Sequence, residues 1–126
     1  MLIKGFYKTI EVASNGLDIT ATIKLNVDHE VYNGHFPGKP VVPGVIQLQI
    51  VKELVEKNID KKLFMKKIGQ VKYLVPIIPG NSPQLVFTIS NKKTDENKIK
   101  SIVSIGYDNI VFTKAKIEFI EKKVIK

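Results

Sequence analysis

One loop of the chain, Gly34-His35-Phe36-Pro37-Gly38, places a titratable ring among residues that stiffen the backbone or open it to close approach. Proline restricts φ, and glycine lets another group come near the backbone, so the imidazole of His35 should be held on a rigid loop. An imidazole titrates near neutral pH and can accept and return a proton within one turnover. We expect His35 to act as a general base, with a plain turn or packing role as the alternative for any loop histidine.

A second feature with chemical potential is Pro43-Gly44-Val45, where a helix is expected to begin. Proline in the first turn beside glycine leaves free backbone N–H groups at the positive end of the helix dipole. The Gly44 amide is the best placed of these to bind a developing oxyanion, because no side chain blocks approach to it. An ordinary helix start explains the same residues equally well when they are taken alone.

The segment from Pro43 to Asn58 predicts a long helix, because it is rich in helix formers and has no proline or glycine after Gly44. Its apolar residues form a stripe and then widen it over the first two turns: Val45, Leu48, Val51 and Val55, joined by Ile46, Ile50 and Leu54. Such a helix should be buried. Gln47 and Gln49 would then need hydrogen-bond partners.

Strands are predicted on both sides of this helix by alternation of apolar and polar residues and by the turn residues between the runs. The expected strands are Phe6 to Val12, Ile19 to Val27, Met65 to Ile78, Gln84 to Ser90, Ile99 to Tyr107 and Ile110 to Ile120. A single long helix among five or six antiparallel strands predicts an α+β fold in which one curved sheet wraps the helix, the outline of a hotdog fold. We expect residues 1–126 to form one such domain.

Composition narrows the function classes. The 126 residues, 44% of them hydrophobic, suit one continuous core, and no apolar run is long enough to cross a bilayer. We expect a soluble cytoplasmic protein without a leader segment. The absence of cysteine excludes disulfides, thiol nucleophiles and thiolate metal sites. The spacing of His29 and His35 points to no metal, and no carboxylate cluster completes a metal site with His29. No metal or other cofactor is therefore expected, and His29 is interpreted as a strand-end residue.

The net charge of +8 favours acidic partners. The lysines are scattered over residues 52–72 and 92–126, without interleaved exposed aromatic residues or a nucleic-acid motif. We therefore expect neither nucleic acid nor membrane as a partner, and an acidic carrier protein stays the stronger candidate.

Two segments make the sequence similar to a known family. Residues 34–45, Gly-His-Phe-Pro-Gly-Lys-Pro-Val-Val-Pro-Gly-Val, resemble the active-site segment of the 3-hydroxyacyl-(acyl carrier protein) dehydratases, a hotdog-fold family. Residues 71–81, Val-Lys-Tyr-Leu-Val-Pro-Ile-Ile-Pro-Gly-Asn, resemble the strand of that family that ends in a proline–glycine turn. The resemblance covers residues 17–120.

The resemblance implies a role for several residues. His35 matches the catalytic histidine, and Gly44 matches the glycine whose amide polarises the thioester carbonyl. The family also implies a homodimer, or an oligomer of such dimers, in which each site joins the histidine of one chain to a helix residue of its partner. The acyl chain would enter a tunnel along that interface. The candidate substrate-binding residues are Phe36, Pro37, Gly38, Val45 and Tyr73, with core packing as the alternative for the two aromatic residues.

The sequence departs from the family at the acidic partner of the histidine. That acid lies fourteen residues after the histidine, where this chain has Gln49. An amide cannot shuttle a proton, but Gln49 can orient the 3-hydroxyl or a water while His35 carries both proton transfers. Glu53, one turn later on roughly the same helix face, is the alternative acid, or else a surface charge.

These features predict dehydration of a 3-hydroxyacyl thioester on acyl carrier protein to the trans-2-enoyl thioester, in fatty-acid or related specialised lipid or polyene synthesis. Two alternatives stay open. A hotdog acyl thioesterase would use His35 or Glu53 to activate water, and a non-catalytic acyl-carrier-binding partner subunit is the interpretation that Gln49 favours.

Overall fold

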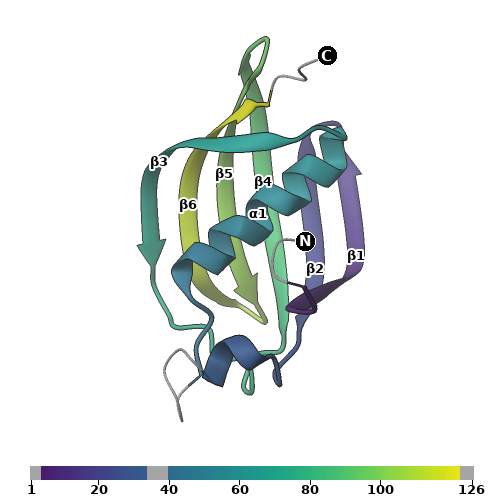
Figure 1. The fold of residues 1–126 in the computed structure, drawn as a ribbon. Helices are drawn as coiled ribbons and strands as arrows, with labels where there is room; N and C mark the ends of the chain where they lie inside the picture. Colours follow the sequence, from purple (N-terminus) through teal and green to yellow (C-terminus); the bar gives the residue numbers. More distant parts are fainter. Residues whose placement is uncertain (1–3, 34–39, 123–126) are drawn as a thin grey trace.

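The computed structural model describes residues 4–33 and 40–122, and within them the elements follow the predicted order (Figure 1). They are β1 (Tyr7–Asn15), β2 (Asp18–Leu25), a short 3-10 helix (Glu30–Asn33), α1 (Gly44–Ile59), β3 (Leu63–Tyr73), β4 (Gln84–Asp95), β5 (Lys98–Tyr107) and β6 (Ile110–Glu121). The loop residues His35, Phe36, Pro37 and Gly38 lie outside the described residues.

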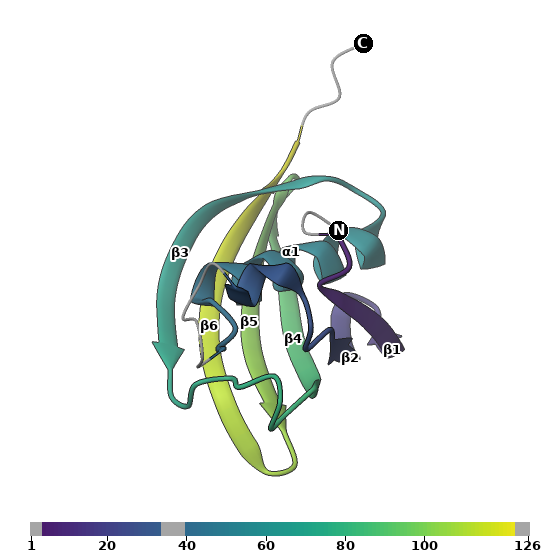
Figure 2. The same cartoon turned by 60° about the horizontal axis from the view of Figure 1, so that its bottom comes forward.

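The strands form one antiparallel sheet in the order β1-β2-β4-β5-β6-β3. Helix α1 runs diagonally across one face of the sheet (Figure 1), and the turned view shows the sheet curving around it (Figure 2). This arrangement confirms the predicted hotdog fold. No helix in the described ranges combines the length and the apolar character that a membrane span requires.

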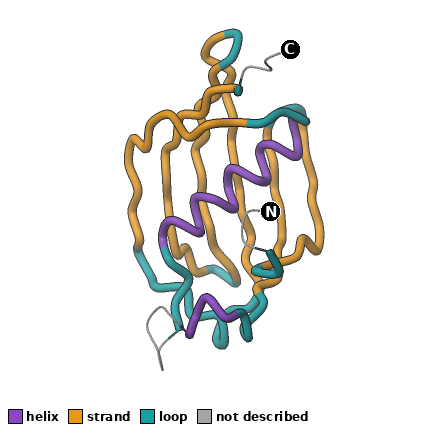
Figure 3. The backbone as a smooth tube through the Cα atoms, in the orientation of Figure 1, coloured by secondary structure: helices purple, strands orange, loops and turns teal. Residues whose placement is uncertain are grey.

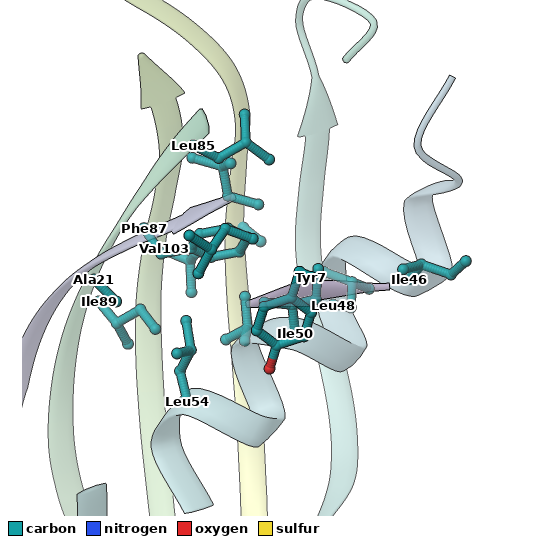
Figure 4. Packing of buried hydrophobic residues seen from close by; sticks show 14 of the residues in the cluster. Tyr7, Ala21, Ile46, Leu48, Ile50, Leu54, Leu85, Phe87, Ile89 and Val103 are labelled. Atoms are coloured by element: carbon teal, nitrogen blue, oxygen red, sulfur yellow. The ribbon is translucent and has the colours of Figure 1, made fainter. Parts of the chain in front are cut away.

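The core lies between α1 and the concave face of the sheet. Alternate residues of β2, Ile19, Ala21 and Ile23, are buried, and α1 contributes buried residues such as Val51 and Val55. Figure 4 shows Leu48, Ile50 and Leu54 of the helix in one buried cluster with the strand residues Phe87, Ile89 and Val103. Since burying one such aliphatic side chain stabilises a fold by about 1.5–3 kcal/mol, this layer holds the helix firmly on the sheet.

The largest differences from the predicted strand bounds are at the ends of β3 and β4. Strand β3 ends at Tyr73 and not at Ile78, because the amides of Leu74 and Val75 both donate to the Phe112 carbonyl, at 2.8 and 3.1 Å, and the chain turns away. Strand β4 continues to Asp95 through polar residues where a loop was expected. There the β4–β5 hairpin extends past the rest of the sheet (Figure 3), so both of its faces meet water and apolar alternation is not required.

Candidate active site at the N-terminus of the helix

Helix α1 begins at Gly44 without a side-chain cap. Pro43 precedes it with φ −59° and ψ 144°, and its carbonyl accepts the amides of Ile46 and Gln47 at 3.1 and 3.2 Å. Among the described residues, no backbone carbonyl outside the helix accepts the amide of Gly44 or Val45. The positive end of the helix dipole therefore presents N–H groups that can receive an anionic oxygen.

The side chain of Tyr73 lies directly against Gly44. A Cβ atom at position 44 would overlap the Tyr73 hydroxyl and lie 3.0 Å from its Cε1, so this close approach requires glycine. The Val42 amide donates a hydrogen bond to the Ile77 carbonyl at 2.9 Å. This bond joins the segment before α1 to the segment after β3, and so brings Gly44 and Tyr73 together. Burial raises the pKa of Tyr73, although the side chain is still 53% exposed.

Gln47 fixes the first turn of α1 to the sheet. The side chain is only 4% exposed; its Nε2 donates to the Val42 carbonyl at 3.2 Å, and its Oε1 accepts from the Thr113 hydroxyl at 2.6 Å. The expectation that an enclosed Gln47 needs partners is confirmed. Both the nitrogen and the oxygen of its amide bond the protein, so Gln47 orients the helix N-terminus relative to β6.

Gln49 and Glu53 form one hydrogen-bonded unit with Tyr7, a residue that sequence reasoning missed. Gln49 Nε2 donates to Glu53 Oε2 at 2.9 Å, and the Tyr7 hydroxyl donates to Glu53 Oε1 at 2.7 Å. Burial raises the pKa of Tyr7 above its ordinary value, and the Glu53 carboxylate raises it further. Nothing in the sequence links Tyr7, a polar residue at the start of a strand, to Glu53, which lies 46 positions away.

Val45, Gln49 and Glu53 succeed each other one turn apart along the less buried side of α1. Val45 is 76% exposed, so the prediction that it belongs to the buried stripe was wrong. The sheet covers the neighbouring Ile46 to Leu48 and leaves Val45 uncovered. Leu74 and Val75, next to Tyr73, are exposed as well. Exposed apolar residues thus adjoin the helix N-terminus, as is common where a ligand or a second chain binds.

His29 is a structural residue, located beyond the end of β2. Its Nδ1 accepts from the Val31 amide at 3.1 Å, and its Nε2 lies 2.9 Å from the Lys4 carbonyl. Since Nδ1 must accept, Nε2 carries the proton, and both ring nitrogens are engaged. The ring also contacts Phe6 edge to face, with 5.4 Å between centroids.

The structure therefore joins Gly44 to Tyr73 and Gln49 to Glu53. Residues His35, Phe36, Pro37 and Gly38 fall outside its described part, and their roles stay predictions. No group of three or more histidine and carboxylate side chains in the described ranges could hold a metal ion.

Known proteins resemble the chain in both sequence and structure. A family model described as ApeI-like, ApeI dehydratase, matches residues 11–107. The 3-hydroxyacyl-(acyl-carrier-protein) dehydratase FabZ of Fusobacterium nucleatum is 25% identical over 118 residues, covering 90% of this chain and 82% of that protein. The protein of the same name from Levilactobacillus brevis is 25% identical over 108 residues, covering 80% of this chain and 73% of the relative.

Among solved structures, the dehydratase heterocomplex ApeI:P from Xenorhabdus doucetiae superimposes with a TM-score of 0.72 at 18% identity, covering 89% of this chain and 96% of that one. This likeness agrees with the hotdog fold. Because the family match extends from β1 through α1 to the end of β5, the chain belongs to the ApeI-like family.

Proposed function

We propose that the protein is a dehydratase that converts a 3-hydroxyacyl thioester, carried on acyl carrier protein, to the trans-2-enoyl thioester and water. The observation that carries this proposal is the ApeI-like match over residues 11–107, which includes the predicted site segment and all of α1. The FabZ relatives, whose names state this activity, support it. The reaction would serve fatty-acid or related specialised lipid synthesis.

In the proposed mechanism, the uncapped start of α1 receives the thioester carbonyl. Removal of the C2 proton pushes negative charge onto that oxygen, and the Gly44 amide at the helix N-terminus stabilises it. Loss of one such donor typically lowers kcat by about 100- to 1000-fold in enzymes that stabilise an oxyanion. Tyr73, which lies against Gly44, would border the thioester, and the exposed Val45 would contact the acyl chain.

His35 is proposed to take the C2 proton and return it to the departing hydroxyl. Its position in the family motif supports this role. Gln49 is proposed to bind the 3-hydroxyl, since an amide can accept or donate a hydrogen bond without exchanging a proton. The family resemblance assigns the histidine and the helix residue of one site to two chains of a homodimer. The net charge of +8 supports an acidic carrier as partner.

The test is to incubate the purified protein with 3-hydroxyacyl and 2-enoyl thioesters of acyl carrier protein, following their interconversion and the release of free thiol. Reversible hydration that His35→Ala abolishes is the expected result. Thiol release without enoyl product would replace the dehydratase with a thioesterase.

The specific observation that favours a second candidate is Gln49 at the position of the family acid. If the protein were a non-catalytic partner subunit, it would be inert towards short, medium and long acyl chains, and Gln49→Glu would restore turnover. The same assay therefore separates the two candidates.

A further inference from the structure

We propose that Glu53 and Tyr7 are positioning residues of this site, which fix the Gln49 amide so that its carbonyl oxygen, and not its NH2 group, is presented to the 3-hydroxyl of the substrate. The inference rests on the proposed dehydratase function. It assigns the carboxylate on α1 to orienting a neighbour, where the sequence suggested a replacement acid.

The orientation of Gln49 follows from the chemistry of its partner. An ionised carboxylate has acceptors only, so the Gln49 atom that lies 2.9 Å from Glu53 Oε2 must be the nitrogen. The other Glu53 oxygen already accepts from the Tyr7 hydroxyl at 2.7 Å, and two donors stabilise the charged carboxylate. With its nitrogen held by Glu53, the amide of Gln49 directs its oxygen the other way.

Tyr7 makes this arrangement more than a surface pair on one helix. Exposed pairs four residues apart stabilise a helix only weakly, and their side chains exchange partners freely. Here the third member, Tyr7, comes from β1 and belongs to the buried core cluster (Figure 4). A tyrosine hydroxyl is protonated and able to donate throughout the neutral range, and burial, which raises the pKa of Tyr7, extends that range. The carboxylate is therefore anchored to the sheet, and Gln49 is anchored through it.

A fixed carbonyl oxygen at Gln49 determines how the substrate hydroxyl binds. The hydroxyl donates its hydrogen to Gln49 Oε1, which leaves the oxygen lone pairs free to take a proton. In the elimination, the C2–H bond breaks, its electrons form the C2–C3 double bond, and the C3–O bond breaks. The oxygen leaves with its own hydrogen and the proton that the base returns, as water. Gln49 exchanges no proton, so one acid–base group suffices.

The experiment measures kcat and KM for hydration of a 2-enoyl thioester of acyl carrier protein, together with the side-chain amide signals of the protein labelled with 15N-glutamine. The variants are Glu53→Ala, Glu53→Gln and Tyr7→Phe. Glu56→Ala is the matched control, because Glu56 is also an α1 carboxylate with a structural hydrogen bond, accepted from the Leu63 amide at 2.8 Å. The hydrogen bond of the Gln49 side chain goes to Glu53 and not to Glu56. The Gln49 signal is identified by its loss in Gln49→Leu.

Glu53→Ala should lower kcat by about ten- to hundredfold, with KM changed less than about twofold, and should move the Gln49 signal to that of a solvated amide. Glu53→Gln should recover part of kcat, because its amide oxygen can still accept from Gln49. Tyr7→Phe should have a smaller effect in the same direction, and Glu56→Ala should leave both readouts at wild-type values.

An active wild type whose kcat and Gln49 signal survive Glu53→Ala would overturn the inference and leave the dehydratase standing. A fall in kcat without a change in the Gln49 signal would also overturn it, because the loss would then be structural. A wild type inactive on every thioester would overturn the proposed function, and the catalytic role of the unit with it.

Discussion

Gln49→Glu would test the hydrogen-bonded unit on α1 through protein stability alone. In the wild type, the amide nitrogen of Gln49 lies 2.9 Å from a carboxylate oxygen of Glu53. The substitution replaces this donor with a second carboxylate. Two carboxylates at such a separation cannot both stay ionised, so either the pair retains a proton or the side chains move apart.

The loss of stability caused by Gln49→Glu has an upper bound. Holding one glutamate with an ordinary pKa of about 4.3 in its protonated form at pH 7 costs about 3.7 kcal/mol. Gln49 and Glu53 are only partly buried, so screening and side-chain movement reduce the expected loss to about 1–2 kcal/mol. The substitution raises a carboxyl pKa in the folded state. The penalty is therefore absent below the unfolded pKa of about 4.3 and reaches its full size once the pH exceeds the folded value.

Urea denaturation of wild type, Gln49→Glu and the double variant Gln49→Glu/Glu53→Gln over a range of pH provides the measurement. The single variant should be destabilised at neutral pH and approach the wild type as the pH falls. The double variant should stay within about 0.5 kcal/mol of wild type, since it exchanges donor and acceptor and still offers Tyr7 an acceptor. Equal stability of Gln49→Glu and wild type at every pH would refute the contact.

Three further predictions concern the framework. Gly106→Ala should lower stability by about 1–3 kcal/mol in urea denaturation, because a Cβ there would lie 2.5 Å from the Ile110 carbonyl oxygen. Gln47→Leu should lower the free energy of unfolding by about 1–3 kcal/mol, because it leaves the Thr113 hydroxyl unpaired in the core. Adding Thr113→Val should recover part of this loss. Strictly additive effects of the two substitutions would count against the hydrogen bond. The pKa of Tyr7 is raised above 10.0 only in the folded state, so its contribution to the free energy of unfolding is complete below about pH 10 and is lost as the pH rises through the folded value. Tyr7→Phe should therefore reduce the fall in stability at alkaline pH, measured by urea denaturation.

The secondary structure was predictable because one face of the sheet is exposed to solvent and the other is buried. Ile19, Ala21 and Ile23 alternate with polar residues in the sequence and are buried in the structure, which is the direct signature of such a strand. The start of α1 was equally predictable from Pro43-Gly44, and the helix begins at Gly44. Local patterns were sufficient for these features, since each depends on neighbours along the chain.

The contacts between distant segments could not be predicted from local sequence patterns. Tyr73 and Gly44 meet because the Val42 amide bonds the Ile77 carbonyl, a pairing with no sequence signature. Tyr7 meets Glu53 across 46 positions, and periodicity marked Tyr7 only as part of a strand. Helical spacing did place Gln49 and Glu53 on one face, but it could not show that they bond to each other. These features depend on tertiary packing, which a period along the chain does not encode.

The strand order also affects how the chain folds during its synthesis. Strand β3 lies at the edge of the sheet beside β6, with Leu63 opposite Glu121 and Tyr73 opposite Thr113. A nascent chain therefore completes α1 and β3 well before β6, the strand that β3 pairs with, has been synthesised. Pairing of this kind over a long sequence separation is slow, and the unfinished chain exposes apolar surface. We expect the domain to close only after release of β6 from the ribosome exit tunnel, and to need protection from aggregation until then.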